Sequence, residues 1–282
     1  NKQVKNGYGY RIRFFTIFTK MNEKEKIMKK TITSYLLPFT LYLLPFLGYA
    51  QSFQWIKDGG SSENLGSNDY EQAYSIATDS QKNVYVLSKV GMSSLNIDGN
   101  PKTNYDDPSS TPTDVVLASF ACDGTYRWSK IIGGADTENI SAVQVDSQDN
   151  VYIAGRILSC DDGTALYPFP ARIDNDYVFV NSPSACSRLF LAKFNTNGIL
   201  QYVKRPEPNL TNSPSFASFG FELQNDVIYW FVWLKPGTYS DGALINTNTD
   251  PQTPFVLRYN LDGSFIEGVQ LGTFQFNGAV DS

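Results

Sequence analysis

The sequence predicts an all-β protein assembled from a repeated unit of four short strands. Two recurring motifs lead to this prediction. The first is the pair TDSQKNVYVLSKV and VDSQDNVYIAGRI, which start at Thr78 and Val145, 67 residues apart. The second is a glycine turn between apolar runs, which occurs at Gly124, Gly198 and Gly263. The content of aromatic and β-branched residues also argues against disorder.

Each copy of the first motif is predicted to be a hairpin, because β-branched and aromatic runs flank a polar turn. In the first copy, Asp79 and Ser80 can cap the turn with their side chains. Asn83 is expected to leave the turn with a positive φ, which Asn tolerates. The predicted strand pairs are 73–79 with 83–89, 140–145 with 150–156, and, in a divergent third copy, 216–223 with 227–234.

The three glycine turns predict a second hairpin in each unit. Asp or Asn stands directly before each glycine, and this dipeptide between apolar runs is a strong hairpin signal. Glycine is expected there because the turn needs a positive φ. The predicted strand pairs are 115–120 with 125–131, 189–194 with 199–204, and 255–260 with 264–270.

Four-stranded units in tandem are typical of a β-propeller, whose blades radiate about a central axis. Three blades are expected, at approximately 73–131, 140–204 and 216–270. Because propellers have ~4–8 blades, three do not complete a ring. We therefore expect an incomplete β-propeller, with further blades downstream of Ser282.

One additional strand is predicted ahead of the first blade. FQWIKDGG matches YRWSKIIGG on Trp55 and Trp128, so residues 53–57 are expected to be an orphan strand. A terminal strand that completes the last blade removes exposed sheet edges, and this strand is expected to close the ring in that way.

Residues 28–50 are expected to be a secretory signal peptide. Met28 begins a short basic segment, an apolar run follows, and the small-residue sequence GYA ends at Ala50. The alternative, a transmembrane helix, is disfavoured because the run is shorter than ~20 residues and contains two prolines. Residues 1–27 are interpreted as a non-native upstream extension, and residues 51–282 as the exported chain.

The exported chain is acidic and contains no histidine. Nine of the 23 Lys and Arg and two of the 28 Asp and Glu lie in the first fifty residues, which leaves 14 basic and 26 acidic residues, a net charge of about −12. This acidity argues against nucleic acid and anionic membranes as partners. The absence of histidine excludes His-based triads, His metal sites and His acid–base catalysis.

Three cysteines leave their pairing open. Disulfides form in exported proteins. Cys160 and Cys186 bracket one long loop and are the favoured pair, with Cys122 free. The alternative is that all three are unpaired.

The second unit contains WSKIIGGADTEN, VDSQDNVYIAGR and LAKFNTNGILQYVK. With the matching motifs elsewhere in 51–270, these strings resemble the SBBP-type β-propeller repeat of secreted bacterial proteins. The first unit departs from the family at Ser88, where the family has glycine, and the third unit lacks the motif's Asp. The resemblance implies a large exported or cell-surface protein associated with type IX secretion, and it supplies no catalytic residues.

Any ligand is expected at the end of the blades that carries the long loops 90–114, 157–188 and 235–254, because loops on rigid scaffolds tend to carry function. Glu71 and Glu138 precede the first strands of their blades at this end. These two glutamates could bind a cation or a polar ligand. The alternative is that they accept hydrogen bonds from the loop backbone.

Two other features of the loops could bind ligands. Ca²⁺ takes oxygen ligands, and one loop offers four carboxylates without EF-hand spacing, so calcium is one hypothesis and a solvated loop the other. Four aromatic residues could stack on sugars or pack in the core. The carboxylates are those of Asp161, Asp162, Asp174 and Asp176, and the aromatic residues are Tyr167, Phe169, Tyr177 and Trp230.

The sequence contains no phosphate-binding glycine loop, no G-x-S-x-G elbow and no metal-type cysteine spacing. We therefore expect a non-catalytic exported or cell-surface propeller that binds protein or glycan and does not insert into a membrane once the signal is cleaved. One alternative is a polysaccharide-acting enzyme whose two carboxylates are shared with other blades. Another is a structural spacer in a large adhesin.

Overall fold

The computed structural model describes ten stretches of the chain. They are 55–60, 71–91, 94–103, 105, 113–134, 138–158, 170–179, 187–206, 215–248 and 252–272. All of them belong to one compact unit that begins at Trp55. Strands and one short 3-10 turn are the regular elements of these stretches, and the predicted all-β class is confirmed for them.

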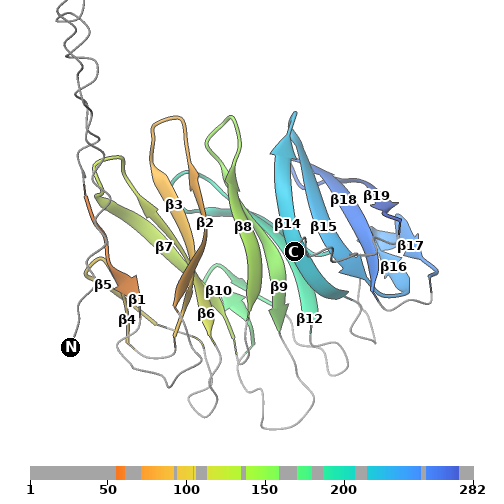
Figure 1. The fold of residues 1–282 in the computed structure, drawn as a ribbon, viewed down its shortest axis with the longest axis horizontal. Coiled ribbons are helices and arrows are strands. Elements are labelled where there is room, and N and C mark those ends of the chain that lie inside the picture. Colours follow the sequence, from red (N-terminus) through yellow and green to blue (C-terminus); the bar gives the residue numbers. More distant parts are fainter. Residues whose placement is uncertain are drawn as a thin grey trace, which may run out of the picture. The chain divides into compact units, whose positions relative to one another are not determined.

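Three antiparallel sheets form the body of this unit, and each contains four consecutive long strands in chain order; two sheets have only these four strands, and the first is extended to six by a short hairpin (Figure 1). Sheet 1 contains β2 (Gln72–Thr78), β3 (Val84–Val90), β6 (Asp114–Phe120) and β7 (Tyr126–Gly133). Sheet 2 contains β8 (Asn139–Val145), β9 (Val151–Leu158), β12 (Ser187–Phe194) and β13 (Leu200–Lys204). Sheet 3 contains β14 (Ser215–Gln224), β15 (Val227–Leu234), β18 (Thr253–Asn260) and β19 (Phe265–Gln270). All twelve predicted strands are present, within two residues of their expected bounds.

Each connection between the second and third strand of a sheet carries a short hairpin that the sequence did not predict. In sheet 1 it is β4 (Leu95–Ile97) with β5 (Asn100–Lys102), and β4 also pairs with β1 (Gly59–Gly60). In sheet 2 it is β10 (Arg172–Ile173) with β11 (Tyr177–Val178), and β10 also pairs with β7. In sheet 3 it is β16 (Gly237–Tyr239) with β17 (Leu244–Asn246), separated by the 3-10 turn η1 (Ser240–Gly242).

The turn glycines have the predicted positive φ, at 85° for Gly124, 76° for Gly198 and 79° for Gly263. The prediction of a positive φ for Asn83 is wrong, because the positive φ falls one residue earlier, on Lys82 (63°). Asn83 instead donates its backbone N–H and its Nδ2 to the carboxylate of Asp79, at 2.8 and 2.7 Å.

The orphan strand expected at 53–57 stays a prediction. Residues 53 and 54 lie outside the described residues, and 55–57 pair with no strand in the described part of the chain. The strand of this region is β1, two residues further along the chain.

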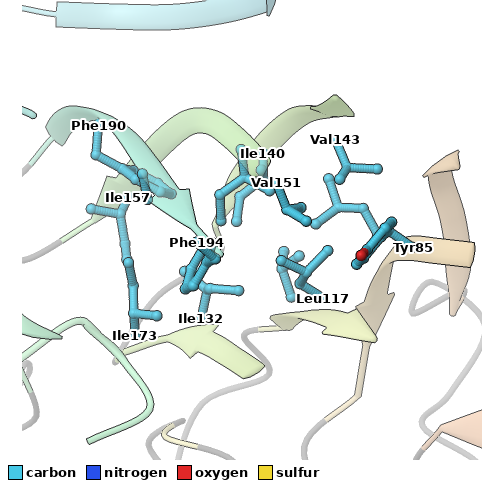
Figure 2. Packing of buried hydrophobic residues seen from close by; sticks show 14 of the residues in the cluster. Tyr85, Leu117, Ile132, Ile140, Val143, Val151, Ile157, Ile173, Phe190 and Phe194 are labelled. Carbon is cyan, nitrogen blue, oxygen red and sulfur yellow. The ribbon is translucent and has the colours of Figure 1, made fainter. Parts of the chain in front are cut away.

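Sheet 2 packs with one face on sheet 1 and with the other on sheet 3. The first contact is a core built from all the strands of the two facing sheets and from the β10–β11 hairpin. Figure 2 shows Tyr85 and Leu117 of sheet 1 beside Val143, Val151 and Phe194 of sheet 2. A second core, centred on the fully buried Trp230, joins sheets 2 and 3. A third covers the other face of sheet 1, over which β4 lies.

Two equivalent contacts, here called joints, link sheet 1 to sheet 2 and sheet 2 to sheet 3. In each, an aromatic side chain of one sheet's fourth strand bonds the glycine turn of the next sheet. Trp128 of β7 donates its Nε1–H to the carbonyl of Thr196, two residues before Gly198, at 3.0 Å. Its ring lies so close to the turn that a Cβ on Gly198 would come within 2.6 Å of it. At the second joint, Tyr202 of β13 donates its hydroxyl to the carbonyl of Leu261, two residues before Gly263, at 3.2 Å.

The repeated Asp and Tyr of the opening motif lie beside these joints. Asp79 accepts the hydroxyl of Tyr85 at 2.9 Å, and Asp146 accepts that of Tyr152 at 2.8 Å. Each tyrosine hydroxyl also reaches the next sheet, where Tyr85 meets Thr196 Oγ1 at 3.2 Å. The motif therefore recurs because each copy closes a turn and helps to fix the sheet that follows.

Candidate functional site

The long-loop end is defined here by the connections 91–113, 159–186 and 235–252 and by the residues just before β2, β8 and β14. Because the sheets are antiparallel meanders, the two tight turns of each sheet lie at its opposite end. In Figure 1 the tight turns between β2 and β3 and after β8 point to the top of the view.

Glu71 and Glu138 occupy this end in different environments. Glu71 is exposed, and its Oε1 accepts the backbone N–H of Gly91, at the start of the first long connection, at 3.4 Å. Glu138 is buried, with 2% of its surface exposed. The contact of Glu71 is of the backbone type considered as the alternative above, and a ligand at either glutamate stays a prediction.

Sequence reasoning missed three buried polar residues, one in each sheet, at the first or second position of the third strand. Asp114, Arg188 and Thr253 each stand ten residues before the turn glycine of their hairpin, and all three are at most 3% exposed. That constant spacing was the available signal. Gly133 leaves room for Asp114, since a Cβ on Gly133 would lie 1.5 Å from Asp114 Oδ1.

The long connection of sheet 1 is tied to the hairpin of sheet 2. Tyr105 donates its backbone N–H to Asp114 Oδ2 at 2.8 Å and its hydroxyl to Asp174 Oδ1 at 3.3 Å. The guanidinium of Arg172 lies over the Tyr105 ring, 5.0 Å from its centroid. Burial, followed by the nearby carboxylate of Asp174, raises the pKa of Tyr105 to about 12. Tyr105 is therefore protonated at neutral pH and serves as a hydrogen-bond donor.

The carboxylates of the β10–β11 turn bind protein groups. Asp176 forms an ion pair with Lys130 of β7, with Nζ and Oδ2 2.6 Å apart. Asp174 takes a left-handed conformation (φ 41°) and donates its N–H to the carbonyl of Ile131 at 2.8 Å. Burial raises the pKa of its side chain. These contacts hold the hairpin on β7.

No group of three or more His, Cys, Asp or Glu that could hold a metal ion occurs among the described residues. Several residues proposed from the sequence lie outside the described part of the chain, namely Cys160, Cys186, Asp161, Asp162, Tyr167 and Phe169. The calcium hypothesis and the disulfide therefore stay predictions. Cys122 is an exposed free thiol.

Two aromatic residues considered for sugar stacking have structural contacts. Trp230 is fully buried between sheets 2 and 3 and donates its Nε1–H to Ser218 Oγ at 2.8 Å. It is a core residue, in agreement with the alternative given above. Tyr177 is half-buried, with its ring edge-on to Phe179, the centroids 4.9 Å apart.

At the long-loop end, hydrogen bonds and ion pairs of the described side chains thus connect neighbouring sheets. The carboxylates of Glu71, Asp114, Asp174 and Asp176 bind backbone, tyrosine or lysine groups, and these contacts hold the loops in place. Among the described residues, no helix is long and apolar enough to cross a membrane. No family model matches the chain, and no curated protein matches it either.

Proposed function

We propose that the chain is part of an exported, SBBP-type β-propeller that binds a protein or a glycan at its long-loop end without catalysis. The observation that carries the proposal is the repeated joint. An aromatic side chain from the fourth strand of one sheet bonds a carbonyl two residues before the turn glycine of the next, at both joints. A constant step from sheet to sheet is what a ring of similar blades requires.

Binding is proposed at the long-loop end because exposed apolar residues there stand on hairpins anchored to the sheets. Val178 of β11 is 45% exposed and Ile245 of β17 is 64% exposed. Anchored loops lose little conformational entropy on binding, which favours recognition. The acidic surface favours neutral glycans or protein surfaces with basic patches over polyanions.

The proposal is tested with purified residues 51–282 on an array of neutral and acidic polysaccharides and on immobilised cell-surface proteins. The double variant Val178→Asp and Ile245→Asp is expected to lose binding by about tenfold or more. Ile199→Asp, at an exposed tight turn (59% exposed), is the matched control and should bind normally. Binding lost only in the control would place the site at the other end, and release of reducing sugars would favour the enzyme alternative.

A further inference from the structure

Trp55 makes with sheet 1 the contact that Trp128 makes with sheet 2. Its Nε1–H donates to the carbonyl of Cys122, two residues before Gly124, at 3.0 Å, the distance found at the first joint. A Cβ on Gly124 would come within 2.7 Å of the Trp55 ring. The Trp55 ring also lies 6.3 Å from that of Phe120, its centroid spacing matching the 6.4 Å between Trp128 and Phe194.

The lysine two residues further along repeats the correspondence. Lys57 pairs with Asp98 in the β4–β5 turn at 2.8 Å, as Lys130 pairs with Asp176 in the β10–β11 turn at 2.6 Å. Both ion pairs join a W-x-K segment to the hairpin of the sheet that follows it.

The backbone contacts correspond as well. Asp98, with φ 50°, donates its N–H to the carbonyl of Asp58 at 3.1 Å. Asp174, with φ 41°, donates to that of Ile131 at 2.8 Å. β4 pairs with β1 as β10 pairs with the end of β7. Residues 55–60 therefore dock on sheet 1 as β7 docks on sheet 2.

Residues 55–58 differ from β7 in pairing with no strand among the described residues. Ser129, which follows Trp128, is 3% exposed, whereas Ile56, which follows Trp55, is 80% exposed. On the same side, Ile76 and Tyr74 of β2 are 67% and 45% exposed. An unpaired backbone edge beside exposed apolar side chains is a template for strand addition.

We propose that residues 55–60, with Ile76 and Tyr74, form a docking surface for a further three-stranded antiparallel unit of this same repeat, whose edge strand pairs with residues 55–58. The inference rests on the propeller proposed above, but it needs no ligand at the long-loop end. The occupant supplies the first three strands of a blade, and residues 55–60 supply the fourth.

A complete four-stranded sheet, such as sheet 3 of a second copy, fits this surface poorly. The place against sheet 1 that the fourth strand of a preceding sheet would occupy is already filled by Trp55 and Lys57. In sheet 3, the position of Trp128 and Tyr202, four residues after the turn glycine, is held by Glu267, which pairs with Arg258 on the exposed surface. A unit that lacks its fourth strand is therefore the occupant that the contacts favour.

The test uses residues 51–282 and a synthetic peptide, SRLFLAKFN, that copies residues 187–195. This segment contains β12, the third strand of sheet 2, which pairs there with the fourth strand, β13. Amide hydrogen exchange located by mass spectrometry should slow by about tenfold at residues 55–58 when the peptide is added. The same peptide with alternate backbone amides N-methylated keeps its side chains but cannot complete a ladder, and should protect nothing.

Variants assign the protection to the proposed surface. Trp55→Ala should abolish it, whereas Ile266→Asp, on the exposed β19 of sheet 3, should leave it unchanged. Protection confined to β19, or none up to the solubility limit of the peptide, would overturn the proposal. Protection of 55–58 that rises with protein concentration without peptide would identify a second copy as the occupant and overturn it as well. None of these readouts depends on glycan or protein binding, so the two proposals fail independently.

Discussion

Val143 in sheet 2 and Ile76 in sheet 1 occupy the same position of the repeat, the second paired residue after a bulge in the first strand. Val143 is 1% exposed, because sheet 1 packs over it, whereas Ile76 is 67% exposed. Their local sequences are similar, so the neighbouring sheet determines burial. In this fold the stabilising apolar contacts therefore lie between sheets as much as within them.

The largest effect is expected from placing a charge at these two equivalent positions. Val143→Asp buries an unpaired carboxylate between sheets 1 and 2 and should cost more than about 3 kcal/mol of unfolding free energy. Ile76→Asp should cost less than about 0.5 kcal/mol. Urea denaturation followed by tryptophan fluorescence measures both. Equal costs would show that a partner covers Ile76 in solution.

The next effect separates two reasons for a glycine in a turn, namely its positive φ and the close approach of a neighbouring ring. Gly99→Ala introduces a side chain at φ 81° in open space and should cost about 1 kcal/mol through backbone strain. Gly198→Ala, at φ 76°, adds a clash with the Trp128 ring and should cost about 2–4 kcal/mol. Thermal and urea unfolding of the two variants provide the comparison. Equal losses of unfolding free energy would show that the Trp128 ring does not restrict the side chain at position 198.

A third effect concerns the repeated aspartate. Burial alone would raise the pKa of Asp146, but hydrogen bonds from Asn150 and Tyr152 outweigh it and hold the pKa below its ordinary value of 3.8. The carboxylate therefore stabilises the fold above pH 3.8, and this contribution is lost as the pH falls through the lower folded-state pKa.

Asp146→Asn should accordingly cost about 1–3 kcal/mol at pH 7 and should lose less further stability between pH 5 and pH 2 than the unmodified chain does. Urea midpoints across this pH range provide the measurement. An unchanged acid dependence would mean that Asp146 does not contribute through its ionised form.

The smallest expected losses of stability come from two charged groups. One is a lysine at the contact between sheets 2 and 3, and the other belongs to an exposed ion pair of sheet 3. Lys193 Nζ donates to the carbonyl of Leu261 in the next sheet at 3.1 Å, so Lys193→Met should cost about 1 kcal/mol. Glu267→Gln removes one member of the exposed pair with Arg258 and should change stability by less than about 0.5 kcal/mol. A larger loss in Glu267→Gln would indicate that the open face of sheet 3 is covered in solution.

The strands could be predicted because their signals are local. Asp-Gly and Asn-Gly at Gly124, Gly198 and Gly263 fix hairpins, and β18 of the third hairpin alternates between buried and half-buried residues. The hairpins in the long connections were missed because strands of two or three residues leave no periodicity. Their recurring left-handed residues, Asp98 and Asp174, follow an isoleucine in both copies, a weak pattern that is visible only in retrospect.

The contacts of the candidate site could not be predicted, because they join residues far apart in the chain. Asp174 stood out in the sequence as a carboxylate for calcium, yet it accepts the hydroxyl of Tyr105, 69 residues earlier. The error at Asn83 is local instead: its side chain donates to Asp79, four residues earlier, and the positive φ of the turn falls on Lys82. Which side chains satisfy one another depends on the packing of sheets, which no single motif specifies.

A double-mutant cycle of Trp128→Leu and Gly198→Ala tests most directly whether the aromatic–glycine contact joins successive sheets. If the ring and the turn touch as described, Gly198→Ala should cost about 1–2 kcal/mol less in the Trp128→Leu background, because only backbone strain is then left. Additive costs, with a coupling energy near zero, would contradict the joint and with it the repeated step from sheet to sheet.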